Sequence, residues 1–167
     1  MLIFGHVGLT TAAAQAVRPG EDLRAPALMS LLPDLIDKPV RVLWPALVND
    51  STRGFAHSLA GAAVVLIALV AARGRRPRTA LLWACYAGHL VLDRMWLAQD
   101  RIVLLWPLLG PFPRPGPGSV LLAHLNYYDV GGELVGLLLL LELARRHRLF
   151  ERARLLAFCR TGELRPA

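Results

Sequence analysis

The chain has 167 residues, of which 55% are hydrophobic and 19% are charged, and its mean hydropathy is +0.45. Soluble domains carry about 25% charged residues, so this composition argues against an ordinary soluble domain and favours a lipid environment. The net charge of +7 does not indicate nucleic-acid binding, because the basic residues cluster in 73–78 and 145–154, beside long apolar runs and without interleaved aromatic residues. The two cysteines, Cys85 and Cys159, form no metal-binding motif and no disulfide framework.

Two segments precede the first long apolar run. Residues 2–17 carry no formal charge and are rich in small side chains, which allow helices to approach closely within a membrane. We expect a helix there that is buried among its neighbours. Residues 26–36 are apolar but too short to cross a bilayer, which takes about 20 residues. They are predicted to form a half-helix or re-entrant segment that ends in Asp34 and Asp37.

Longer apolar runs follow. Residues 55–72 and 79–97 predict two antiparallel spans joined by the basic turn 74–78. Residues 102–119 contain a tryptophan and several prolines, which exclude a single helix and predict an interfacial loop. Residues 120–143 predict the last span, which a basic amphipathic tail follows.

These segments predict an all-α fold, a polytopic membrane helix bundle with about three to four transmembrane helices plus short re-entrant or interfacial segments. We expect residues 1–147 to form a membrane-embedded helical domain that holds a metal site, and residues 148–167 to form a basic cytoplasmic amphipathic tail. Most of the 19 Lys and Arg residues fall on the side of the turn 74–78 and of this tail. The positive-inside rule then places that side in the cytoplasm of a bacterial inner membrane and the opposite ends toward the extracytoplasmic face.

Ionisable residues inside apolar segments are costly to bury and therefore mark functional sites. His89 and Asp93 are four residues apart, which places them on one helix face, and His57 lies at the same end of the antiparallel neighbour. Imidazole and carboxylate groups are ligands for zinc, and for iron or manganese where oxygen donors dominate. The predicted metal ligands, which this topology brings to one level of the membrane, are His6, Asp34, Asp37, His57, His89 and Asp93.

Each of these residues also has a purely structural interpretation. A single histidine such as His6 can be a hydrogen-bonded packing residue in a helix bundle. Asp34 and Asp37 can cap helices or form turns beside prolines. Asp93 can simply pair with Arg53 or Arg94. Together, however, six such groups at one depth favour a shared site.

The motifs resemble those of the YdjM-like family of bacterial membrane-bound metal-dependent hydrolases. The matching stretches occur in the family's order and cover most of residues 1–110. They are FGHVGLT around His6, SLLPDLID at 30–37, RGFAHSLAG at 53–61, GHLVLDRMW at 88–96 and LLWPLLG at 104–110. The resemblance places the six predicted ligands on the family's polar positions. This chain departs from the family at 94–96, where Arg-Met-Trp stands in place of a Thr-Pro-x-Gly-like turn.

The predicted function is that of an integral-membrane metal-dependent hydrolase acting on a lipid or a headgroup-level (phospho)ester. A divalent metal lowers the pKa of its bound water toward about 7, and six candidate ligands allow one or two ions, most plausibly zinc. We expect His57, His89 and Asp93 to bind the metal directly. Asp34 and Asp37 are predicted to complete the site or act as the catalytic base.

The prediction also includes two arginines as substrate-binding residues, and two alternative functions for the same cluster. Arg53 and Arg94 are predicted to bind an anionic group of the substrate such as a phosphate. The same His and Asp residues could instead form a transport or metal- and proton-sensing site, or stabilise a non-catalytic membrane scaffold. A transporter would be expected to show repeats with broken helices in both halves, and the sequence has none. Membrane lipid is the expected partner in each case.

Overall fold

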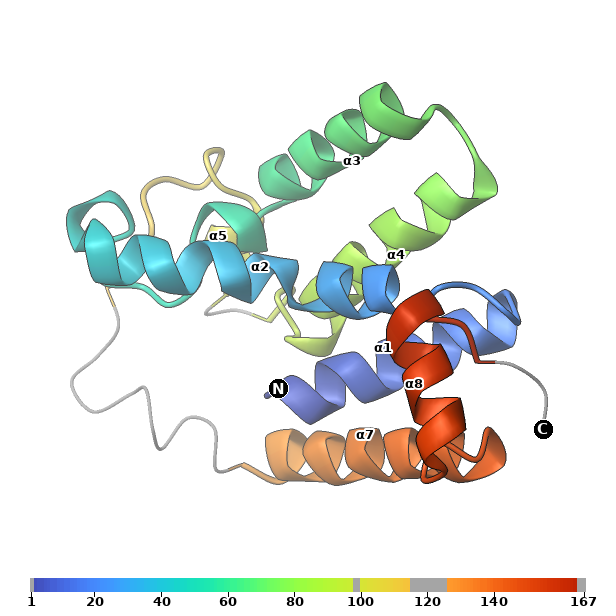
Figure 1. Cartoon of the computed structure of the whole chain (residues 1–167). Coiled ribbons are helices and arrows are strands. Elements are labelled where there is room, and N and C mark those ends of the chain that lie inside the picture. Colours follow the sequence, from blue (N-terminus) through green and yellow to red (C-terminus); the bar gives the residue numbers. More distant parts are fainter. Residues whose placement is uncertain (1, 98–99, 115–125, 165–167) are drawn as a thin grey trace. The chain divides into compact units, whose positions relative to one another are not determined.

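The computed structural model describes residues 2–97, 100–114 and 126–164, and within these ranges the chain is all-helical (Figure 1). No strand occurs among them, and Asp22 and Glu163 form one isolated β-bridge. The prediction of an all-α fold is confirmed. The chain forms two compact units, one made of residues 1–28 and 124–167 and the other of residues 29–123.

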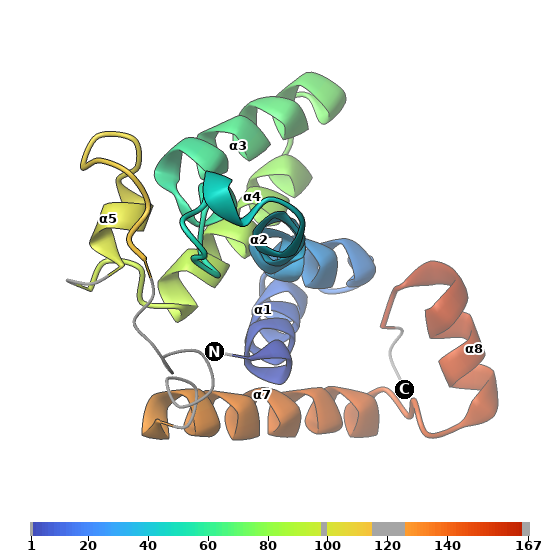
Figure 2. The ribbon, with the colours of Figure 1, turned by 90° about the vertical axis from the view of Figure 1, so that its left-hand side faces the viewer.

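Unit 1 is built on a close crossing of two helices, α1 (Ile3–Val17) and α7 (Tyr127–Arg146), which lie side by side in Figures 1 and 2. The crossing depends on glycine. A Cβ atom on Gly8 would lie 2.1 Å from the carbonyl oxygen of Gly136, and one on Gly136 would lie 2.1 Å from that of Phe4. The predicted helix over 2–17 is present, and its small residues permit the close approach that the sequence suggested.

A carboxylate on α7 holds the beginning of α1. The side chain of Glu133 accepts hydrogen bonds from the backbone N–H groups of Leu2 at 2.8 Å, Phe4 at 2.9 Å and Gly5 at 2.9 Å. These amides belong to the first turn, where a helix has no internal acceptors for them and where a negative charge is stabilised. Glu133 therefore caps α1 from the neighbouring helix. Unit 1 ends with α8 (Arg152–Thr161).

Unit 2 begins on α2 (Arg24–Leu43), whose first turn belongs to unit 1. The prediction of a half-helix over 26–36 is wrong in length, because α2 continues for 20 residues through Pro33 and Pro39. Each proline removes one backbone hydrogen bond and opens the turn before it. The helix nevertheless persists across both, and it carries Asp34 and Asp37 within its length rather than at its end.

The next two helices form a hairpin, with α3 (Leu59–Arg73) antiparallel to α4 (Pro77–Leu92), as Figures 1 and 2 show. The helix α3 begins later than the predicted residue 55, because Phe55–His57 form the short 3-10 helix η2 and the Ser58 hydroxyl accepts the Gly61 N–H as an N-cap. Likewise α4 ends at Leu92 rather than at residue 97. These boundaries put His57 in η2, directly before the N-cap of α3, rather than inside an α-helix.

The remaining part of unit 2 packs over η2. It contains the short helix α5 (Arg101–Leu104), and a second 3-10 helix, η1 (Pro45–Leu47), lies between α2 and η2. The Phe55 ring contacts Trp106 and Phe112 edge-on, with centroid distances of 5.1 and 5.0 Å. The prediction that 102–119 is not one helix is confirmed as far as residue 114, and residues 115–119 lie outside the described part of the chain.

The predicted spans are short in the structure. Within the described ranges, no helix combines the length and the apolarity that crossing a bilayer requires. The 15 residues of α3 rise about 22 Å, against a hydrocarbon core of about 30 Å. The predicted last span over 120–143 corresponds to α7, which begins at Tyr127, and residues 120–125 are outside the description.

Candidate metal centre

The centre of unit 2 is organised by one buried carboxylate, that of Asp37 on α2. Its two oxygens accept the backbone N–H groups of Gly54 at 2.7 Å, Ala56 at 3.1 Å and His57 at 3.1 Å. Asp37 has no exposed surface, and a Cβ atom on Gly54 would lie 3.3 Å from its Oδ1 atom. The glycine of the R-G-x-x-H-S motif thus allows the loop to close around the carboxylate.

Asp37 also sets the orientation of the His57 imidazole. The His57 Nδ1 atom lies 2.7 Å from Asp37 Oδ2, and both side chains are fully buried. A carboxylate that accepts backbone N–H groups acts as an acceptor toward the ring as well, so the proton resides on Nδ1. The Nε2 atom of His57 is then left with its lone pair.

The second imidazole is fixed in the same way by a different acceptor. His89, on the last turn of α4, places its Nδ1 atom 2.6 Å from the backbone carbonyl oxygen of Ser30 on α2. A carbonyl can only accept, so the neutral His89 ring carries its proton on Nδ1 and a lone pair on Nε2. These tautomers follow from the partner atoms. The two Nε2 atoms face each other at 3.1 Å.

Two lone pairs at this distance require a positive charge between or beside them. A proton on one ring would supply it, and so would a cation bound to both nitrogens. Two nitrogen ligands about 2.1 Å from one zinc ion are roughly 3.0–3.4 Å apart at ordinary coordination angles, which matches the observed separation. Hydrogen bonds from the far ring nitrogens to a carboxylate and a carbonyl are also typical of metal-binding histidines.

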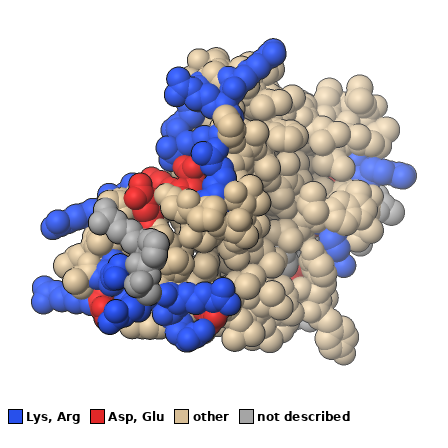
Figure 3. All heavy atoms as spheres, turned by 90° about the vertical axis from the view of Figure 1, so that its right-hand side faces the viewer, with Lys and Arg blue, Asp and Glu red and all other residues tan. Residues whose placement is uncertain are grey.

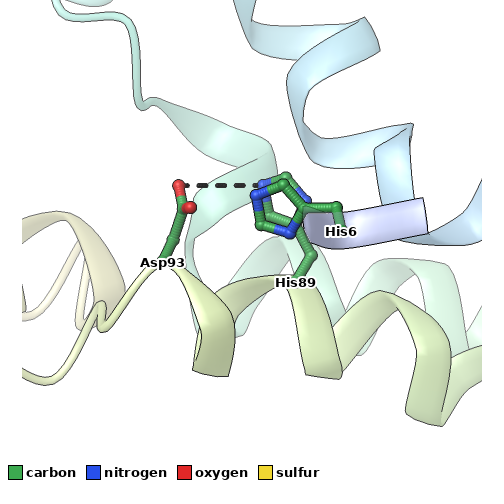
Figure 4. A group of neighbouring side chains, drawn as sticks. All are labelled: His6, His89 and Asp93. Carbon is green, nitrogen blue, oxygen red and sulfur yellow. Dashed lines mark ion pairs between the residues drawn. The ribbon is translucent and has the colours of Figure 1, made fainter. Parts of the chain in front are cut away.

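Two more carboxylates lie close to this pair of nitrogens. An Asp34 oxygen is 3.7 Å from His57 Nε2, and ligand atoms of Asp34, His57 and His89 all lie within 4.8 Å of one another. An Asp93 oxygen is 3.8 Å from His57 Nε2 and 3.9 Å from His89 Nε2. Figure 4 shows Asp93 at the end of α4 with its ion pair to the ring of His89, one turn earlier. The two imidazoles together with one of these carboxylates form a group that could hold a zinc, manganese or iron ion.

The predicted substrate-binding arginines occupy different positions. Arg53 lies between two carboxylates, with Nη2 3.2 Å from Asp93 Oδ2 and Nη1 2.7 Å from Asp100 Oδ2. Burial opposes its charge, but the charges of Asp93 and Asp100 outweigh it and raise the Arg53 pKa above its ordinary value. The pairing of Asp93 with Arg53, which a structural role for Asp93 predicts, is thus present within the cluster. Arg94 is half-buried in the turn after α4, at a φ of +53°.

The structure brings five of the six predicted ligands together in unit 2, namely Asp34, Asp37, His57, His89 and Asp93. The sixth, His6, belongs to unit 1, where α1 carries it as a buried side chain. Its role as a ligand stays a prediction.

Sequence reasoning missed four groups around the site. The Ser30 carbonyl carries no side-chain signal, although Pro33 three residues later marks a loosened helix turn. Asp100 binds Arg53, and the Tyr86 hydroxyl donates to the carbonyl oxygen of Ala56 in the loop that binds Asp37. Lys38 forms an ion pair with Asp34 at 2.7 Å, which the spacing of four residues on a helix could have revealed.

Comparison with known protein families matches residues 1–159 to the family described as the YdjM inner membrane protein, and the chain belongs to this family. The match covers all of unit 2, most of unit 1 and every residue of the site described above. No curated protein and no solved structure matches the chain.

Proposed function

We propose that this member of the YdjM inner membrane protein family is a metal-dependent hydrolase that acts at the membrane on a lipid or headgroup-level (phospho)ester. One observation carries the proposal. The Nε2 atoms of two buried imidazoles face each other across 3.1 Å, with carboxylates on two sides. This arrangement needs a positive charge beside the two nitrogens, and a bound cation would supply it with both rings acting as ligands.

The residues divide into those that would hold the cation and those that position them. His57, His89 and Asp93 would hold one divalent ion, either zinc or, as alternatives, manganese or iron, and Asp34 lies beside them. Asp37 is fully engaged by backbone N–H groups and by His57 Nδ1, which favours a positioning role over the direct ligation and catalysis expected from the sequence.

The chemistry follows from this donor set. A bound divalent cation supplies Lewis-acid polarisation and acidifies a water molecule. Asp34 is half-buried, whereas Asp93 is buried, and Asp34 would accept the proton of an attacking water. Arg53 would bind an anionic oxygen of the ester while keeping its contact with Asp100. Arg94 would add a second positive charge from the adjacent turn.

We also propose that unit 2 is embedded in the bilayer, as a multi-pass arrangement with the site toward the extracytoplasmic face. The helix α3 carries no charged side chain before Arg73, and Val64 and Ile67 on it are 65% and 68% exposed, as expected for side chains that face lipid. The basic turn between α3 and α4 would be cytoplasmic. Reporter fusions at this turn should be active in the cytoplasm only, and periplasmic activity would refute this orientation.

Metal analysis of the purified protein tests the site directly. Wild-type protein isolated without chelator should contain about one equivalent of a divalent metal. His57→Ala and His89→Ala should each lose it, whereas His147→Ala, in unit 1, should retain it. Metal retained in both cluster variants, or absent from the wild type after reloading, would overturn the site and leave the scaffold interpretation.

Hydrolysis is tested separately on mixed vesicles of neutral and anionic phospholipids. The metal-loaded wild type should release water-soluble phosphate-containing products, and Asp34→Asn should retain metal better than it retains turnover. A protein that binds metal stoichiometrically but releases no product from any phospholipid would favour transport or metal sensing by the same cluster.

A further inference from the structure

Unit 1 contains an exposed helix surface that shares no residue with the candidate metal site. We propose that the exposed face of α8 docks on an anionic lipid surface. This surface, called here the α8 face, consists of Arg152, Leu155, Leu156, Cys159 and Arg160, together with the preceding Phe150. This proposal does not depend on the hydrolase proposal, because none of these residues belongs to the cluster around His57 and His89.

The spacing and exposure of these residues define one face of the helix. Positions 152, 155, 156, 159 and 160 recur at three- and four-residue intervals, which places them on one side of an α-helix, and all are exposed. Leu155 and Leu156 are 46% and 48% exposed, and Phe150 is 74% exposed. The α8 face is therefore an apolar stripe with an arginine at each end.

The C-terminal end of α8 is tied to its own unit. Arg24 donates from its guanidinium to the backbone carbonyls of Cys159, Arg160 and Thr161 at 3.2–3.3 Å, which caps the C-terminus of the helix. Arg154, Ala157 and Phe158, on the side of the helix away from the α8 face, line a cavity together with residues of the preceding turn. The α8 face itself is exposed.

The charge of the surroundings selects the occupant. The stretch 145–160 contains six arginines and one glutamate, and Lys and Arg side chains gather over this C-terminal part of unit 1 in Figure 3. An apolar stripe flanked by arginines is the pattern of a helix that lies in a headgroup layer, where the apolar side chains insert and the guanidinium groups bind lipid phosphates. A neutral protein partner would not compensate this excess of positive charge. The membership of the chain in an inner membrane protein family places it where anionic lipid is present.

Cys159 offers a probe on the face itself, since it is exposed whereas Cys85 is buried. A nitroxide attached to Cys159 of the full chain, in a Cys85→Ala background, reports its surroundings through collisions with oxygen and with a water-soluble nickel chelate. The matched control carries the label at Ala157→Cys with Cys159→Ser, on the opposite side of the same helix. Both proteins are reconstituted in phosphatidylcholine vesicles with and without phosphatidylglycerol.

With phosphatidylglycerol, the Cys159 label should show a several-fold higher ratio of oxygen to nickel collisions than without it, and the label at position 157 should not change. The double variant Arg152→Gln/Arg160→Gln alters only exposed side chains and should abolish the difference. Equal nickel access at Cys159 in both vesicle types would overturn the proposal. Shielding that persists in detergent and grows with protein concentration would overturn it too, in favour of a second copy of the chain on this face. Metal content of the same samples keeps a failure here distinct from a failure of the metal site.

Discussion

Each of the two units contains a carboxylate that accepts three backbone N–H groups, but the two carboxylates have different roles. In unit 1, the carboxylate of Glu133 accepts three backbone N–H groups from the beginning of α1. In unit 2, the carboxylate of Asp37 accepts three backbone N–H groups from the loop before α3. Both join a helix to a distant stretch of chain by charge-assisted hydrogen bonds. The difference is that Asp37 is fully buried and also holds the Nδ1 atom of His57, whereas Glu133 is half-buried and holds only backbone.

This difference shows what turns a structural anchor into part of a site. Glu133 fixes where a helix begins, and its effect ends with the stability of the α1–α7 crossing. Asp37 fixes a loop and, through the same two oxygens, the tautomer and direction of an imidazole. A substitution of Asp37 should therefore change the orientation of the His57 Nε2 atom, whereas a substitution of Glu133 should not.

The largest effect is expected for Asp37→Asn. An amide keeps one acceptor but turns an N–H donor toward backbone donors and toward His57, so the free energy of unfolding should fall by about 3 kcal/mol. Metal affinity should fall by about 10–100-fold, because His57 loses the partner that fixes its tautomer. Thermal unfolding and metal titration of the reconstituted variant measure the two effects. A metal affinity within twofold of wild type would break the comparison between the units.

A large but purely structural effect is expected for Gly136→Ala. The new Cβ would lie 2.1 Å from the Phe4 carbonyl oxygen, so α1 and α7 must separate, at a cost of about 2–3 kcal/mol. Metal content should remain that of the wild type, since the change lies in unit 1. The matched control is Gly131→Ala on the same helix, where an added Cβ meets nothing within 4 Å. Equal destabilisation by both substitutions would show that the close crossing does not limit stability.

A smaller effect is expected for Glu133→Gln, the counterpart of Asp37→Asn. The substitution removes the charge that the first turn of α1 favours but leaves one acceptor oxygen, so stability should fall by about 1 kcal/mol. Melting temperature reports the loss, and metal titration should give the wild-type affinity. Metal loss in this variant would mean that Glu133 contributes to the cation site after all.

How much of this was predictable from sequence differs between the units. In unit 2, the apolar environment made each ionisable residue conspicuous, and the four-residue spacing of His89 and Asp93 correctly indicated a shared face. The sequence did not reveal which of these carboxylates positions a histidine and which faces the cation site. Asp34 and Asp37 look alike in the sequence, and only the closure of the 54–57 loop around Asp37 distinguishes a positioning carboxylate from one that faces the histidines.

Helix boundaries were the other weak point. The short apolar run 26–36 suggested that the second helix ends early, but α2 continues through Pro33 and Pro39 to Leu43. In unit 1, the small residues of α1 correctly indicated close packing, whereas the role of Glu133 was not predicted. No local pattern says that a glutamate on one helix will cap another that lies more than a hundred residues away in the chain.

The smallest effect is expected for Lys38→Gln, which should change metal affinity with almost no change in stability. Lys38 pairs with Asp34 at 2.7 Å, and its side chain is 56% exposed. Such an exposed pair contributes only about 0.5 kcal/mol, so Lys38→Gln should barely change the melting temperature. It should nevertheless strengthen metal binding, by about twofold, because Asp34 no longer shares its charge with the ammonium group and a repelling cation is removed. Arg41→Gln, one turn further along α2, provides the control and should leave the affinity unchanged. Weaker binding in Lys38→Gln would mean that the lysine orders Asp34 for the ion, and Asp34 would then resemble Asp37 in depending on a partner for its position.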